Sequence, residues 1–190
     1  LSAERGVSLV SGQACVAALR ATGYNVVEID AGADLCQRLE AAAPDLVFNA
    51  LHGRWGEDGA VQGLLEWMRV PYTHSGVLAS ALAMDKTRSK EVFLAAGLPV
   101  AEGLLAPANE VRPPHVMAPP SFVKPHRPGS SVRLSLFQAM ATRPPHFAPS
   151  MPPHVLVERY LPGRSFPSSV MADRAPPRTD IVPPGPTSHP

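Results

Sequence analysis

One loop, residues 48–59 with the sequence FNALHGRWGEDG, carries a histidine and two acids among three glycines. An apolar run leads into this loop and an amphipathic segment, residues 60–68, follows it, which predicts a strand, a loop and a helix. In open parallel sheets, ligands bind where strands end in such loops. His52, Glu57 and Asp58 are therefore candidates for ligand binding or proton transfer. The two acids could equally cap the following helix, whose N-terminus favours negative charge.

The elements around the loop alternate between helix and strand. Apolar residues at helical spacing predict helices at residues 7–19, 35–43, 77–83 and 86–96. Short apolar runs predict strands at residues 26–29, 46–48 and 72–73. This alternation is typical of a parallel sheet with helices on its faces. We therefore expect an α/β domain over residues 1–98, with the loop at the carboxyl edge of its sheet.

Proline separates this half from the rest of the chain. Only Pro44 and Pro71 precede residue 99, so 21 of the 23 prolines lie in the last 92 residues. Proline lacks the amide that helices and central strands require, and doublets spread over the whole half do not fit a single linker. Short strands are still predicted at residues 121–124, 134–137, 155–159 and 169–172, with a Gly/Ser loop at 126–132.

The composition of the chain indicates which partners and which cellular location to expect. A formal net charge of +1 without a long run of Lys or Arg gives no basis for nucleic-acid binding. No apolar run approaches the roughly 20 residues of a membrane helix, and the first residues lack an export signal, so no membrane association is expected. Cys15 and Cys36 lie among small and apolar residues in helical segments. Buried free thiols rather than a disulfide are predicted, which indicates a cytoplasmic protein.

Four segments of the first half resemble, in this order and at these separations, the D-alanine–D-alanine ligases, which are ATP-grasp enzymes of peptidoglycan precursor synthesis. They are SAERGVSL at residues 2–9, the loop at 48–59, QGLLE at 62–66 and PYTHSGVLASALAMDK at 71–86. The resemblance runs nearly without a gap over residues 1–99 and returns at 122–135, 155–166 and, weakly, 179–185.

The resemblance implies a fold of the α/β class in two parts. A parallel-sheet N-terminal domain, the pre-ATP-grasp domain, would cover residues 1–98, and an incomplete ATP-grasp α+β portion would cover residues 99–190. The implied reaction is the ATP-dependent ligation of two D-alanines through an acyl phosphate. The substrates would be D-alanine and ATP, with Mg²⁺ as a cofactor, and the intact family enzyme would be a homodimer.

The resemblance also implies residues that bind the first D-alanine. Glu4 matches a carboxylate that holds the ammonium group of this substrate, a task that suits a carboxylate because a buried cation needs a paired charge. Ser8 and His52 match positions that line the same pocket. Taken alone, Glu4 would be a first-turn partner of a helix dipole and His52 a structural residue. Glu4, Ser8 and, in the flap described next, Ser131 are the residues to which we assign catalytic roles.

A second set of residues matches the ATP site of the family. Two lysines would contact the phosphates, where ammonium groups offset the charge that opposes phosphoryl transfer. The sequence GSSV at 129–132 resembles a glycine-rich flap over the phosphates, and VLVERYL at 155–161 resembles the hinge that meets adenine, with a glutamate accepting from the exocyclic amine. The implied ATP-binding residues are Lys86, Lys124, Ser130, Ser131, Glu158 and Leu161.

Several positions depart from the family pattern. Arg133 stands where the flap has glycine, and Ser165 stands where a glutamate binds the ribose hydroxyls. The first strand of the family fold, and the metal-binding carboxylates, Asn and Arg of its last part, have no counterpart in these residues. We therefore expect an unstable first domain, no protein ligands for a metal, and ATP turnover no faster with D-alanine than without. The alternative to a ligase is a catalytically inactive fragment or pseudoenzyme that acts as a binding or interaction domain.

Overall fold

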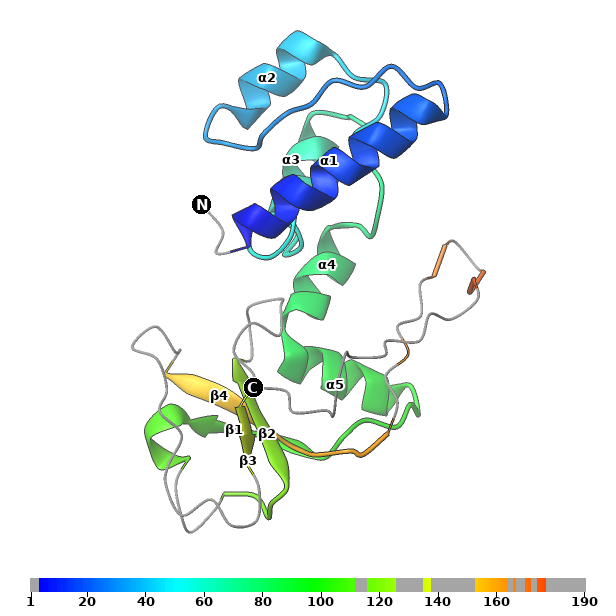
Figure 1. Cartoon of the computed structure of the whole chain (residues 1–190). Helices are drawn as coiled ribbons and strands as arrows, with labels where there is room; N and C mark the ends of the chain where they lie inside the picture. The colour runs from blue at the N-terminus through cyan, green and yellow to red at the C-terminus, as the bar shows by residue number, and fades with distance from the viewer. Residues whose placement is uncertain are drawn as a thin grey trace. The chain divides into compact units, whose positions relative to one another are not determined.

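Two compact units make up the computed structural model of the chain, and they divide after Val100 (Figure 1). The structure describes residues 4–111, 116–125, 135–137, 153–163, 166, 170–171 and 174–176. Each unit is described by itself. The predicted Gly/Ser loop at residues 126–132 lies outside the described residues.

The first unit contains all the α-helices of the described chain, and they confirm the five helices predicted from apolar spacing. They are α1 (Arg5–Ala21), α2 (Leu35–Ala42), α3 (Ala60–Trp67), α4 (Val77–Met84) and α5 (Lys86–Ala95). Local signals set the ends of α5. The Asp85 carboxylate accepts hydrogen bonds from the amides of Thr87 and Arg88, which is a standard N-cap. Gly97 follows the helix with φ at +74°, a conformation that favours glycine.

The strands predicted in the first unit are much reduced. Val47 and Tyr72 form a single parallel bridge, in which the Val47 amide donates to the Pro71 carbonyl at 2.8 Å. The strand prediction at residues 26–29 is wrong, because no described segment pairs with these residues and Val27 is 64% exposed. A strand is defined by its hydrogen-bonded neighbour, and an apolar run alone does not provide one. The α/β class is confirmed, and among the described residues this bridge is the only parallel pairing.

A small apolar core holds α2 and α3 together. Leu39 of α2 packs with Val61 and Leu65 of α3, and all three side chains are buried. Val47 and Tyr72, the two residues of the parallel bridge, pack against this cluster. The Tyr72 hydroxyl donates to the Glu66 carboxylate at 2.8 Å, and this hydrogen bond raises the pKa of Tyr72 above its ordinary value. The core therefore lies beside the strand end that enters the loop.

The second unit is a four-stranded antiparallel sheet in the order β1-β4-β2-β3. The strands are β1 (Gly103–Pro107), β2 (Ser121–Pro125), β3 (Ser135–Phe137) and β4 (His154–Arg159), and a 3₁₀ turn, η1 (Ala108–Glu110), follows β1. Three of these strands match predicted ones, and β1 was not predicted. Part of the strand predicted at 169–172 lies outside the described residues, and Met171 forms only an isolated bridge with Arg174.

Prolines in this sheet lie where a missing amide is tolerated. Pro107 and Pro125 are the last residues of β1 and β2, so neither interrupts the middle of a strand. One face of the sheet carries a buried cluster that includes Val123, Val155 and Val157. Among the described helices, none combines the length and the apolar character that crossing a membrane requires.

The core of the first unit gives a direct stability test. Leu65→Ala should lower the free energy of unfolding by about 2–5 kcal/mol, because Leu65 is 1% exposed and its truncation leaves a cavity. Leu78→Ala on α4 is the matched control, since Leu78 is 80% exposed, and it should change stability by less than about 0.5 kcal/mol. Urea unfolding followed by helical circular dichroism measures both. Equal effects of the two substitutions would contradict the assigned core.

Candidate functional site

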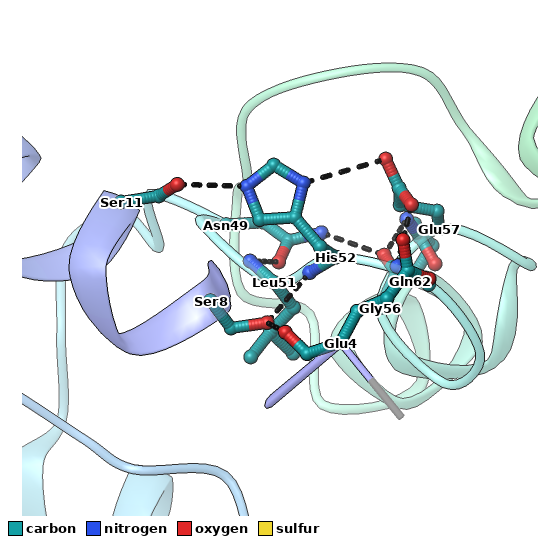
Figure 2. A network of polar contacts seen from close by, with 10 residues as sticks. Glu4, Ser8, Ser11, Asn49, Leu51, His52, Gly56, Glu57 and Gln62 are labelled. Atoms are coloured by element: carbon teal, nitrogen blue, oxygen red, sulfur yellow. Dashed lines mark hydrogen bonds and ion pairs between the residues drawn. The ribbon is translucent and has the colours of Figure 1, made fainter. Parts of the chain in front are cut away.

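The loop after Val47 is folded around one backbone carbonyl, that of Gly56. The Asn49 side-chain amide donates to this oxygen at 2.9 Å, and the Gln62 side-chain amide donates to it at 2.9 Å as well (Figure 2). The Asn49 side-chain oxygen accepts from the Leu51 amide at 3.0 Å. Gln62 is 2% exposed, and its side-chain oxygen has no hydrogen-bond partner among the described residues. The two amide side chains fix the path of the loop from both of its ends.

Glycine is required at two positions of this loop. A Cβ on Gly56 would lie 2.3 Å from the Leu51 Cβ, a distance that no packed structure allows. Gly59 has φ at +90°, and a Cβ there would lie 2.8 Å from the Val77 carbonyl oxygen. Both contacts are with atoms that cannot move away easily. The glycines therefore permit the close approach of the loop to its own start and to α4.

The polar face of α1 lies against the loop. Glu4, Ser8 and Ser11 are spaced by four and three residues, which places them on one side of a helix. The Ser8 hydroxyl donates to the Glu4 carbonyl at 3.3 Å and accepts from the His52 amide at 2.9 Å (Figure 2). The Ser11 hydroxyl lies 2.9 Å from His52 Nε2. The structure thus brings together the three residues that were predicted to line one pocket, Glu4, Ser8 and His52.

The two acids of the loop, Glu57 and Asp58, have different partners. The Asp58 carboxylate accepts from the amide of Ala60, the first residue of α3, at 3.2 Å, so it fulfils the predicted alternative of helix capping. The Glu57 carboxylate instead accepts from the Gly53 amide, and its other oxygen lies 4.0 Å from His52 Nδ1. Both side chains of this His–Glu pair are partly exposed, so their attraction is modest. Glu57 is the acid that belongs to the candidate site.

A cavity of about 430 Å³ lies beside His52 within the first unit. Its walls come from α1 with Ser11 and Cys15, from the loop, and from α4 with Ala79 and Ser80. Pockets that bind small molecules combine apolar walls with a few polar groups, and this cavity has that character. Both cysteines are free thiols, but both are only half-buried, so the prediction that they are buried is wrong.

The second unit brings together two of the predicted ATP-binding residues. Lys124 of β2 and Glu158 of β4 form an ion pair, and their side chains are 28% and 12% exposed. In the sheet register Phe122 is opposite Glu158, so Lys124 is the diagonal neighbour of the glutamate. Leu161 follows β4 and is 62% exposed. A half-buried ammonium next to a buried carboxylate places one donor and one acceptor side by side on the two central strands of the sheet.

Three further residues, Lys86, Ser130 and Ser131, are predicted from the sequence to bind ATP. Lys86 is the first residue of α5 in the first unit. Ser130 and Ser131 lie outside the described residues. Within the described ranges, no three His, Cys, Asp or Glu side chains are grouped where they could hold a metal ion, so we derive no step through a metal.

Sequence reasoning missed three residues of this site, Ser11, Asn49 and Gln62. Ser11 carries a signal, because it follows Ser8 at helical spacing on the face that starts with Glu4. Asn49 and Gln62 lie inside segments that were singled out, but nothing in their residue types indicates that both bind one carbonyl. Their contribution depends on the tertiary path of the loop.

The carbonyl of Gly56 provides a test of this geometry. Asn49→Ala removes two hydrogen bonds of the loop and should destabilise the first unit by about 1–3 kcal/mol. Asn25→Ala, at an exposed position of the same unit, is the control and should stay within about 0.5 kcal/mol of the unmodified chain. Chemical denaturation of both variants measures the difference. If Asn49→Ala were as stable as the control, the loop would not depend on this carbonyl.

This chain is similar in sequence to known D-alanine–D-alanine ligases. The family model for the N-terminus of D-ala D-ala ligase matches residues 31–75. A D-alanine–D-alanine ligase of Ruegeria pomeroyi is 61% identical over 181 residues, which cover 95% of this chain and 59% of the relative. A D-alanine–D-alanine ligase of Roseobacter denitrificans is 62% identical over 181 residues and is covered to 57%. The chain thus spans slightly less than three fifths of the length of these relatives.

A solved structure agrees with the sequence relatives. The D-alanine–D-alanine ligase from Bacillus anthracis complexed with ATP matches with a TM-score of 0.75 and 25% identity, over 98% of this chain and 65% of that one. The match to this structure and the identity to the relatives hold over nearly the whole length of the chain. Over nearly its whole length, the chain is similar to D-alanine–D-alanine ligases.

Proposed function

We propose that this chain is part of an ATP-dependent ligase that joins two D-alanines to D-alanyl-D-alanine through an acyl phosphate, for peptidoglycan precursors. The observation that carries the proposal is that Ser8 of α1 bonds both to the backbone carbonyl of Glu4, the residue just before the helix, and to the amide of His52 on a loop more than forty residues away. The relatives that share about three fifths of this chain's residues bear the name of that ligase. Residues 1–98 would form its N-terminal substrate domain and residues 99–190 part of its ATP-grasp region.

The first D-alanine would bind at the start of α1. Glu4 is 9% exposed, and a carboxylate in such a position suits the ammonium group of an amino acid. Ser8 and His52 would line the same pocket. In this proposal Glu4 and Ser8, together with Ser131, have catalytic roles by holding the substrate in place for attack on its acyl phosphate.

ATP would bind at the second set of residues. Glu158 would accept from the exocyclic amine of adenine, and Lys124, beside it in the sheet, would contact the phosphates together with Lys86. Ser130, Ser131 and Leu161 would complete the contacts. The support for this assignment is the Lys124–Glu158 pair and the similarity to a ligase structure that contains ATP.

The cofactor, assembly and location follow from the same proposal. Mg²⁺ would accompany the ATP phosphates, and the intact ligase would be a homodimer. We place the protein in the cytoplasm, where D-alanine and ATP are available and where free thiols such as Cys15 and Cys36 persist.

The D-alanine site is tested by calorimetric titration. Glu4→Gln should weaken D-alanine binding by about tenfold or more, because the amide cannot pair with the ammonium charge. Glu28→Gln is the control, since Glu28 is exposed and pairs with Arg20 at 3.0 Å, and it should bind D-alanine like the unmodified chain. Unchanged D-alanine affinity in Glu4→Gln would contradict the proposed role of this carboxylate.

The ATP site is tested in the same way. Lys124→Ala removes one donor and leaves the Glu158 carboxylate without this partner, so ATP affinity should fall by about tenfold or more. Arg159→Ala is the control on the same sheet, because its cationic side chain is 63% exposed and should contribute less than about twofold. A similar loss in both variants would indicate general electrostatic attraction and would contradict a specific site.

A further inference from the structure

We propose that Ser11 is a positioning residue for His52. Its hydroxyl donates to Nε2 and, together with the Glu57 carboxylate on the other side of the ring, holds the imidazole in the tautomer that carries its proton on Nδ1. The inference rests on the proposed function in one respect, which is that His52 lines the pocket for the first D-alanine. It adds a residue that neither the sequence nor the family resemblance singled out.

Two serines of one helix face hold His52 at two different points. The Ser8 hydroxyl accepts from the backbone amide of His52 at 2.9 Å, which fixes where the residue lies. The Ser11 hydroxyl, one turn further along α1, lies 2.9 Å from the ring atom Nε2, which fixes how the ring is turned (Figure 2). Both hydrogen bonds join α1 to the loop. Position and orientation of the imidazole are thus set by separate contacts.

The direction of the Ser11 hydrogen bond follows from the other side of the ring. Nδ1 lies 4.0 Å from Glu57 Oε1, which is too long for a hydrogen bond but close enough for the carboxylate charge to favour a proton on Nδ1. The second oxygen of Glu57 accepts from the Gly53 amide, so the carboxylate is oriented by the loop itself. A carboxylate can only accept, whereas a serine hydroxyl can donate or accept. Nε2 is therefore the acceptor and Ser11 the donor.

The tautomer has a consequence for ligand binding. Ser11, His52 and Glu57 all line the cavity of about 430 Å³. A neutral imidazole has one donor and one acceptor nitrogen, and the partner of one nitrogen determines the state of the other. With Nε2 occupied by Ser11, the ring presents its N–H on the Glu57 side. An acceptor oxygen of an amino-acid ligand would find a donor there.

The experiment reads the tautomer directly. The full chain is labelled with ¹⁵N, and spectra are recorded under mildly basic conditions. The chemical shifts of the two ring nitrogens of His52 then show which nitrogen carries the proton. The variant His52→Gln identifies the signals, because they disappear from its spectrum. We expect the Nδ1–H form in the unmodified chain. Ser11→Ala should convert the ring to the Nε2–H form or to a mixture of both.

A matched pair keeps the test valid if Ser11→Ala fails to fold. Ser11→Thr and Ser11→Val have nearly the same shape and differ by one hydroxyl group, so the Thr variant should retain the Nδ1–H form and the Val variant should lose it. Cys15→Ala, one turn further on the same face, should leave the tautomer unchanged. The same tautomer in the Thr and Val variants would overturn the inference, because the hydroxyl would then have no effect on the ring.

The effect on the ligand is measured separately. If the tautomer matters for D-alanine, Ser11→Val should weaken its binding by about fivefold relative to Ser11→Thr, the equivalent of one neutral hydrogen bond. A changed tautomer with equal affinity would overturn the positioning role. Failure of the unmodified chain to bind D-alanine would contradict the proposed function instead, while the nitrogen shifts would still decide whether Ser11 sets the state of His52.

Discussion

The geometry of the candidate site in the first unit depends on the hydrogen bonds to the backbone carbonyl of Gly56. This carbonyl accepts hydrogen bonds from Asn49 at the start of the loop and from Gln62 in the helix that follows. Gln62 is buried and Asn49 is half-buried, so rearranging either amide would leave a polar group without its hydrogen bond, which is costly. The loop can turn this tightly only because Gly56 lacks a Cβ. His52 and Glu57 owe their positions to this geometry.

Helix α1 depends on the loop more than on an apolar core. The helix has no fully buried side chain, and Val10 is 69% exposed. Its described hydrogen bonds with the loop are the one that the Ser8 hydroxyl accepts from the His52 amide and the one between the Ser11 hydroxyl and the His52 ring, and the Arg5 guanidinium pairs with Asp30. The polar groups that would bind substrate thus also hold the helix in place. Substitutions at these serines are expected to affect binding and stability together, which is why variants of equal shape are needed to separate the two.

The elements that depend on nearby residues could be predicted from the sequence. Those that depend on pairing with a distant segment could be predicted only in part. The helices follow from apolar spacing, and Asp85 and Gly97 are local signals for the ends of α5. Residues 26–29 have the composition of a strand but no paired neighbour, whereas β1 pairs along β4 although it contains only leucine, alanine, glycine and proline. β-Pairing is a tertiary property, and composition indicates it poorly.

The same division applies to the site. Glu4, Ser8 and His52 could be named in advance because the family resemblance covers their segments. The sequence left the roles of Glu57 and Asp58 open, since both precede a helix, and only the path of the loop shows that Asp58 caps α3 while Glu57 faces His52. Helical spacing places Ser11 on the same face as Ser8, but only the tertiary structure shows that it contacts the His52 ring.

The central claim, that α1 and the loop form a D-alanine site, is tested most directly by mapping the ligand onto the backbone. Amide chemical shifts of the ¹⁵N-labelled full chain would be recorded with increasing D-alanine and, separately, with L-alanine. A D-alanine site between α1 and the loop should give saturable shifts with D-alanine that centre on Glu4, Ser8 and His52, and much smaller shifts with L-alanine. Shifts that centre elsewhere, or that are the same for both enantiomers, would contradict it.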